Sequence, residues 1–206
     1  MKKPAKRAAQ KPRRTPAQSR SAETVAVIVE AAARVLELRG LDGFNTNAVA
    51  ERAGVSIGSL YQYFRNKDAL LASLIEQQAE PFIRILETIP RDVPFQTALL
   101  QLIEASAHQQ LQRPELSRLL DFIERQATFE DLAKRTIDRV QRVLIELLKR
   151  KDAPPVDNRL EAALEVLSLI RALTDAAGER GEKNHARLAS RIHGAVCGYF
   201  GIARPL

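Results

Sequence analysis

Hydrophobic residues recur along most of the chain at spacings of three and four, the period of an α-helix, while alternating runs typical of strands are scarce. A first helix is predicted to end at Gly40, and its inward positions are Val25, Ile28, Val29, Ala32, Val35 and Leu36. Asn66 is suited to cap another helix that starts at Lys67 and buries Leu70, Leu71 and Leu74. Helical patterns interrupted by prolines continue to the C-terminus. The sequence therefore predicts an all-α protein.

Between these two helices, residues 45–64 predict two short helices joined by a tight turn. Asn45 and Ser56 are suited to cap them, and Gly54 can adopt the left-handed conformation that ends the first. The inward residues are Val49, Ala50 and Ala53 in the first helix, Val55 at the corner, and Leu60 and Phe64 in the second, with Ile57 close to the same side. Gly58 and Gln62 face outward. Such a pair is typical of a DNA-binding helix-turn-helix, and an ordinary helical hairpin with a solvated polar face is the alternative.

The order of these helices and a set of residues within positions 24–75 resemble the tetracycline-repressor (TetR) family of bacterial transcriptional regulators. The residues that carry the resemblance are Glu30-Ala31-Ala32, Gly40, Phe44, Ala50-Glu51-Arg52-Ala53-Gly54-Val55-Ser56, Gly58, Leu60-Tyr61, Phe64 and Lys67. The resemblance implies an N-terminal three-helix helix-turn-helix DNA-binding domain over residues 21–81 and a C-terminal helical effector-binding and dimerisation domain over residues 82–206. It also implies a cytoplasmic homodimer, nucleoid-associated when bound to DNA, that represses a palindromic operator until a small molecule releases it.

The resemblance places DNA contacts at ten positions, which are Thr46, Asn47, Ser56, Ile57, Gly58, Ser59, Tyr61, Gln62, Tyr63 and Lys67. Thr46, Asn47, the two tyrosines and Lys67 correspond to phosphate contacts, and the others lie on the recognition helix. Many relatives carry Lys at the position of Ile57 and His at that of Tyr63, so fewer backbone contacts are expected from this helix. Gln62 is the main candidate for base reading, because an amide can pair with adenine N6 and N7, worth about 1–3 kcal/mol of discrimination. A solvated surface glutamine is the alternative.

The net charge of +7 belongs to the N-terminal arm, residues 1–20, and not to the helical part. The arm holds eight of the 32 basic residues and none of the 25 acidic ones, so the remaining 186 residues carry a net charge of −1. Its Pro, Ala, Gln and Ser content predicts disorder. Placed before the first helix, it can neutralise DNA phosphates or lie along the minor groove. A solvated tail, a fusion remnant or contact with acidic lipid are the alternatives.

In the C-terminal part, helices are predicted over residues 94–112, from Pro114 to Ile123, and over about 128–149, 157–178 and 184–201. Pro81 is expected either to kink the helix from Lys67 or to begin a new one. The last two helices carry more apolar surface than one chain can cover, which predicts a four-helix dimer interface, with a self-contained core as the alternative.

No effector can be identified from the sequence. The polar and aromatic residues considered for an effector pocket are His108, Gln109, Asp121, Phe122, Glu124 and Phe129.

Other functional classes find little support in the sequence. The three histidines are scattered, and neither a phosphate-cradling glycine loop nor a nucleophile elbow occurs, so no enzyme, metal site or cofactor is predicted. Cys197 lies one helical turn after His193, which is interpreted as a structural contact, and a single cysteine suits a reducing cytosol. No apolar run approaches the 18 residues expected of a membrane span. An architectural DNA-binding protein without an effector is the rival interpretation.

Overall fold

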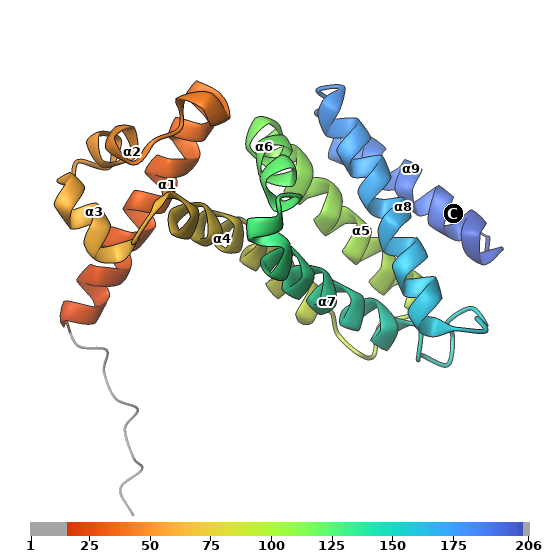
Figure 1. Ribbon diagram of the computed structural model, residues 1–206. Coiled ribbons are helices and arrows are strands. Elements are labelled where there is room, and N and C mark those ends of the chain that lie inside the picture. The colour runs from red at the N-terminus through yellow and green to blue at the C-terminus, as the bar shows by residue number, and fades with distance from the viewer. Residues whose placement is uncertain (1–15, 204–206) are drawn as a thin grey trace, which may run out of the picture.

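A computed structural model describes residues 16–203, with side chains from residue 21, and confirms the all-α prediction for this part of the chain. The elements in chain order are α1 (Pro16–Gly43), α2 (Thr46–Ala53), α3 (Ile57–Tyr63), α4 (Lys67–Glu87), α5 (Phe95–Gln112), α6 (Pro114–Glu124), the 3-10 turn η1 (Ala127–Phe129), α7 (Glu130–Leu147), α8 (Arg159–Glu179) and α9 (His185–Phe200). Figure 1 shows α1–α3 at one end, α5–α9 at the other, and α4 between them.

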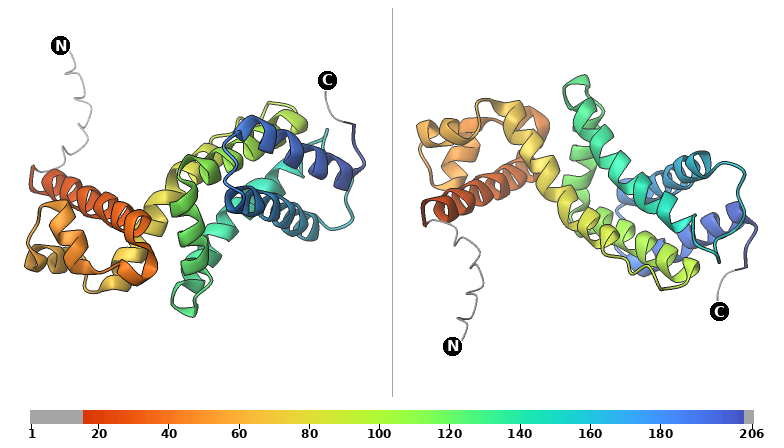
Figure 2. Two further views of the ribbon diagram at one scale, coloured as in Figure 1. Left: turned by 90° about the horizontal axis from the view of Figure 1, so that it is seen from above. Right: turned by 90° about the horizontal axis from the view of Figure 1, so that it is seen from below.

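Helix α4 joins the two parts of the molecule. Both views of Figure 2 show it running from the α1–α3 unit into the C-terminal helices. Of the two outcomes expected for Pro81, the structure has one continuous helix with the proline inside it. Proline has no N–H, so the carbonyl of Gln77 receives no hydrogen bond from position 81. The side chain of Gln109 donates from Nε2 to the neighbouring carbonyl of Gln78 at 2.8 Å, which ties α5 to α4 beside the proline.

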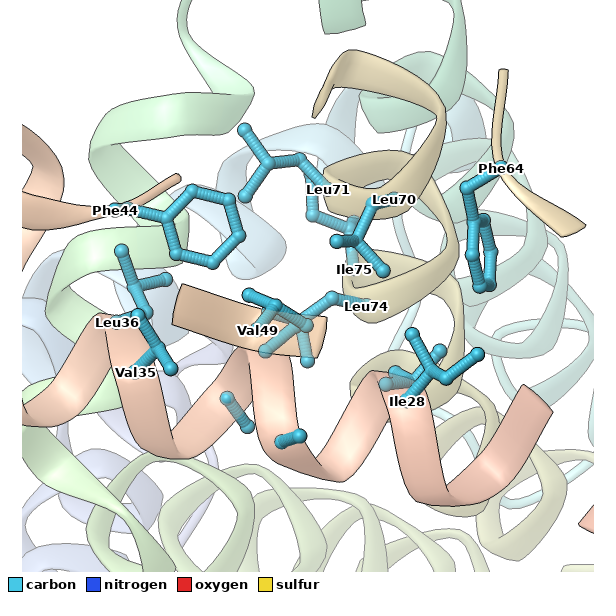
Figure 3. Close-up of a cluster of buried hydrophobic side chains, with 14 of the residues drawn as sticks. Ile28, Val35, Leu36, Phe44, Val49, Phe64, Leu70, Leu71, Leu74 and Ile75 are labelled. Carbon is cyan, nitrogen blue, oxygen red and sulfur yellow. The ribbon is translucent and has the colours of Figure 1, made fainter. Parts of the chain in front are cut away.

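The N-terminal hydrophobic core lies between α1, α2, α3 and α4 (Figure 3). Its centre consists of Ile28, Val35 and Leu36 from α1, Phe44 before α2, Val49 from α2, Phe64 at the end of α3, and Leu70, Leu71, Leu74 and Ile75 from α4. The core continues onto α6, η1 and the start of α7 through Leu116, Leu119, Leu120, Ile123, Phe129 and Leu132. The DNA-binding unit expected at residues 21–81 is therefore packed on the C-terminal part and shares a core with it.

The boundaries of α1 differ from the sequence prediction at its N-terminal end. Gly40 has a φ of 63°, which ends the regular helix as predicted, and residues 41–43 form a separate turn. The helix begins at Pro16, so it includes residues 16–20 of the arm. Proline favours a first helical turn because its missing N–H would have no partner there. The basic residues Lys2 to Arg14 lie outside the described residues.

Ile57, predicted to lie close to the inward side of its helix, is 38% exposed. Helical spacing identifies a hydrophobic stripe but not its edges. The predicted helix over residues 128–149 is shorter, because η1 precedes α7. His193 Nε2 and Cys197 Sγ are 3.5 Å apart and buried, consistent with a structural contact.

Candidate nucleic-acid interface and interior cavities

The turn between α2 and α3 is fixed by backbone and side-chain hydrogen bonds at each predicted cap. The side chain of Asn45 accepts from the N–H of Ala48 at 2.9 Å. Gly54 has φ 68° and ψ 28°, and its N–H donates to the carbonyl of Glu51, while the N–H of Val55 donates to the carbonyl of Ala50. This pair of bonds is the Schellman arrangement, which requires a left-handed residue and so favours glycine. The turn angle is therefore determined by the local sequence.

Helix α3 is held in place by two anchors and one cap. Ser56 Oγ accepts from the N–H of Ser59 at 3.0 Å at its N-terminus. Leu60 and Phe64 are buried in the core beneath it. A helix of seven residues is only marginally stable by its own hydrogen bonds, so these contacts set its orientation. The opposite face of α3 is left to the solvent.

That outer face brings together the residues predicted to contact DNA. Eight of the ten are exposed and Thr46 and Ser59 are half-buried, so none is part of the core. The hydroxyl groups of Thr46 and Tyr61 are 3.1 Å apart and connect α2 with α3. Lys67 at the start of α4 has its Nζ 5.3 Å from the centre of the Phe44 ring, a cation–π contact. The ten residues come from α2, α3 with its cap Ser56, and the start of α4, and most of them are polar.

Gly58 has no structural reason to be glycine. Its backbone is helical, and a Cβ at this position would meet only Ser56 Oγ, at 3.8 Å, an ordinary contact distance. A glycine inside a helix costs about 1 kcal/mol relative to alanine. The missing side chain leaves the centre of the outer face flat, which suits close approach of another molecule.

Residues 28–74 match the sequence model of the family described as "Bacterial regulatory proteins, tetR family". The chain is 47% identical over 49 residues to the tetracycline repressor protein class A from transposon 1721 of Escherichia coli, which covers 24% of this chain and 23% of that protein. It is 30% identical over 139 residues to the transcriptional repressor KstR of Rhodococcus jostii, covering 66% and 64%. The chain spans less than two thirds of the length of these curated relatives.

Solved structures with the same fold include FadR of Bacillus subtilis in complex with stearoyl-CoA, with a TM-score of 0.72, 20% identity, and coverage of 83% of this chain and 96% of that one. A TetR transcription regulator of Haloarcula marismortui has a TM-score of 0.74 at 17% identity, covering 87% and 97%. Fold, turn geometry and sequence matches together identify the N-terminal part as a helix-turn-helix. Residues 28–74 carry the sequence pattern of the TetR family, and the whole chain shares the fold of its solved members.

Two of the cavities in the C-terminal part border residues considered for an effector pocket. The larger of these two, of about 770 Å³, lies between α4, α5 and α9 and is lined by His108 and His185, among others. The smaller, of about 400 Å³, is partly open to solvent and lined by residues of α4, α5, α6, α7 and α8, and we call it the five-helix cavity. Gln109 borders both cavities, and Asp121 borders the five-helix cavity. Of the other residues considered for a pocket, Phe122 is exposed and Phe129 belongs to the N-terminal core.

Three carboxyl groups gather beside the five-helix cavity. Asp121 on α6 and Asp175 on α8 line it, and Glu124 lies one turn after Asp121. Burial raises the pKa of Asp121 and of Asp175, and Asp121 raises that of Asp175 further. Burial, followed by the charges of Asp121 and Asp175, raises the pKa of Glu124 to about 7. These carboxyl groups were visible in the sequence, but their convergence depends on the packing of α6 against α8.

An ion-pair cluster that the sequence did not reveal joins the two parts of the molecule. Arg113, between α5 and α6, contacts Glu37 of α1 with Nε at 2.8 Å and Nη2 at 2.7 Å, and Glu30 of α1 with Nη1 at 2.9 Å. The hydrogen bond from Arg113 lowers the pKa of Glu37. The partners are 76 and 83 residues apart in the chain, so no local pattern could have indicated them. Arg113 therefore connects the cavity-lining helices directly to α1.

A second arginine holds α4 on both sides of Pro81. Arg139 of α7 contacts Glu80 at 2.7 Å and binds Glu87 through two nitrogen atoms, each at 2.9 Å. The proline weakens the helix between these two glutamates, and the guanidinium spans it. Helix α4 is thus fastened to α7 as well as to α5. No helix in residues 16–203 has the length and apolarity needed to cross a bilayer.

Proposed function

We propose that this protein is a dimeric transcriptional regulator that represses from a palindromic operator and is released by a small-molecule effector. The observation that carries the proposal is the α3 surface, which is anchored from below by Leu60 and Phe64 and exposes a flat polar face. A helix presented in this way fits the major groove, which is wide enough to admit one. The exposed side chains of Gln62 and Tyr63 take no part in the core, so their chemistry is available for DNA.

Each outer residue has a role consistent with its position. Gln62 reads an adenine edge, and Gly58 allows the helix backbone to approach the groove floor. Ile57, exposed at the start of α3, suits an apolar contact with a thymine methyl group. The hydroxyl and amide groups of Thr46, Asn47, Ser56, Ser59, Tyr61 and Tyr63 contact phosphates or base edges, together with the ammonium of Lys67 at the N-terminus of α4.

The palindrome requires two copies of the chain, and α8 and α9 offer a surface for the partner. Leu160, Leu164 and Tyr199 are exposed there, although each is a large and mostly apolar side chain. A self-complementary pair of helices from each subunit buries such residues in a four-helix interface. The interface then fixes the separation of the two α3 helices, which must be about 34–36 Å to reach successive major grooves.

Effector control follows from the elements that surround the five-helix cavity. A ligand there touches α4, whose N-terminal residue Lys67 belongs to the DNA-binding surface, and α6, which packs on α1. The larger cavity does not reach α6. A ligand that binds more tightly when the two DNA-binding units are splayed shifts the population away from the operator-binding form. The relative FadR of B. subtilis, of the same fold, holds stearoyl-CoA, which supports a ligand-binding role for such a domain.

The test is selection of bound sequences from a random DNA pool, for the wild type and for Gln62→Ala. We expect the wild type to select two inverted half-sites about 10 base pairs apart. Gln62→Ala should lose preference at one base pair per half-site, corresponding to about 1–3 kcal/mol, with unchanged thermal stability. Gln126→Ala, at another exposed glutamine in the connection between α6 and η1, is the control and should select the wild-type sequence. Diffuse protection without a palindrome would contradict the proposal and favour an architectural protein.

A further inference from the structure

The five-helix cavity has an uneven distribution of charge. Its apolar wall includes Phe82 of α4, Val140 of α7 and Ile170 of α8, while Asp121 and Asp175 contribute carboxylates from α6 and α8. A cavity of about 400 Å³ with an apolar wall and a few converging polar groups is a typical small-molecule site. The sign of the polar groups then determines which ligand charge is favoured.

The carboxylates beside the cavity are only partly neutralised by the protein. Asp121 accepts a hydrogen bond from Gln110 Nε2 at 3.3 Å, and no basic side chain within residues 21–203 forms an ion pair with it. Asp175 is shared by Arg125 at 3.4 Å and Arg171 at 3.8 Å, whose side chains are 66% and 43% exposed. Long, exposed ion pairs contribute little. The three carboxyl groups of Asp121, Asp175 and Glu124 thus have two guanidinium groups near them, and both of these form long ion pairs with Asp175.

The protonation behaviour of the cluster agrees with this charge excess. The pKa of each of the three carboxyl groups lies above its ordinary value, chiefly because of burial. The charge of Asp121 adds to the increase for Glu124 and Asp175, and Arg171 offsets part of it. A positive group placed in the cavity would favour the ionised form of these carboxyl groups.

We propose that the effector is an amphipathic cation, whose positive head lies against Asp121 and Asp175 and whose apolar body packs on Phe82 and Val140. The inference rests on the proposed function, because it names the ligand class for the same effector cavity. Among the side chains of residues 21–203, Arg171 is the only basic one that lines the cavity, and it is already engaged with Asp175. An acidic ligand would therefore meet two carboxylates for each available guanidinium.

The experiment compares three probes that share a ten-carbon chain and differ in the head group: decyltrimethylammonium, decanol and decanoate. Binding is measured by calorimetry, and operator release by fluorescence anisotropy. We expect the cation to bind at least about tenfold more tightly than decanoate and to release the operator. Asp121→Asn should weaken the cation about tenfold and leave decanol unchanged. Glu104→Gln, in the larger cavity, is the matched control and should leave all three affinities unchanged.

The pH dependence provides an independent readout, since a quaternary ammonium has no proton to lose. The charged groups around Glu124 are Asp121 and Arg125 on its own helix, and Arg171 and Asp175 on α8. If the cation requires ionised Glu124, its affinity rises up to about tenfold from pH 6 to pH 8. Glu124→Gln should remove this dependence while retaining a cooperative unfolding transition. Equal affinity at both pH values in the wild type would overturn the role given to this cluster.

Failure of this inference can be distinguished from failure of the proposed function. Operator binding is measured first without any probe, so it does not depend on the ligand class. Release of the operator by decanoate but not by the cation would overturn the cationic effector and leave the regulator intact. Cation binding that Asp121→Asn does not weaken would also overturn the inference, and circular dichroism of that variant shows whether it has folded.

Discussion

The helix-turn-helix and the C-terminal helical part of this protein place their polar groups in opposite ways. Around α3, the apolar side chains of Leu60 and Phe64 lie inside, and polar residues such as Gln62 face outward and take no part in the core. Around the five-helix cavity, carboxyl groups face inward and disturb one another's protonation. Under the proposed function, recognition of DNA is therefore separable from stability, whereas recognition of the effector is not. The predictions below test that separation.

The largest effect is expected from the anchor of the recognition helix. Leu60→Ala removes a fully buried side chain and should cost about 2–5 kcal/mol of unfolding free energy, with loss of operator binding. Leu38→Ala is the matched control, since Leu38 is 70% exposed on α1 and its truncation should cost no more than about 0.5 kcal/mol. Chemical denaturation monitored by circular dichroism measures both. Similar losses of unfolding free energy in the two variants would show that Leu60 does not anchor α3 in the core.

The sequence sufficed for the helix-turn-helix because its determinants are local. Asn45, Gly54 and Ser56 each act within three or four residues of their own position, and Leu60 and Phe64 follow from helical spacing. Ile57 was misplaced because spacing alone does not distinguish the edge of a stripe from its centre. The ten proposed DNA contacts rest on the family resemblance and on their exposure.

The C-terminal part was predicted as helices but not as a site. Its helices could be located from apolar spacing and prolines, and the predicted ranges for α5, α8 and α9 lie within about two residues of the structure. The convergence of Asp121 with Asp175, and of Arg113 with Glu37, depends on contacts between residues 54 and 76 positions apart. Such contacts are set by how whole helices pack, and a single sequence carries no local signal of them.

An intermediate effect is expected at the ion-pair cluster that joins the two parts. Arg113→Met leaves Glu30 and Glu37 without their partner and should destabilise the protein by about 1–2 kcal/mol at pH 7. The pKa of Glu37 is lowered in the folded protein, so its contribution is complete above its ordinary pKa of 4.5 and is lost as the pH falls through the folded value. The difference between wild type and variant should therefore shrink below pH 4.5.

Arg118→Met is the control for that measurement, because Arg118 forms only an exposed pair with Glu115 of the same helix. It should change stability by no more than about 0.5 kcal/mol at either pH. If Arg113 transmits the effector signal, its variant should also bind the operator but respond less to the effector. Full effector response in Arg113→Met would show that α4 carries the signal without this cluster.

The smallest effect on stability, and the sharpest test of the comparison, is expected at Gly58. A Cβ there meets only Ser56 Oγ at 3.8 Å, so Gly58→Ala should stabilise the folded protein by up to about 1 kcal/mol through helix propensity alone. The added methyl group projects toward the DNA side of α3 and should weaken operator binding. Thermal denaturation and anisotropy titration of the same sample measure the two quantities, which are predicted to change in opposite directions.

Gly198→Ala is the control, because Gly198 lies in α9 and a Cβ there would have no neighbour within 4 Å. This variant should gain stability without losing operator affinity, provided the dimer is retained. A Gly58→Ala variant that is more stable and binds the operator as tightly as the wild type would mean that the face of α3 is not where DNA is read.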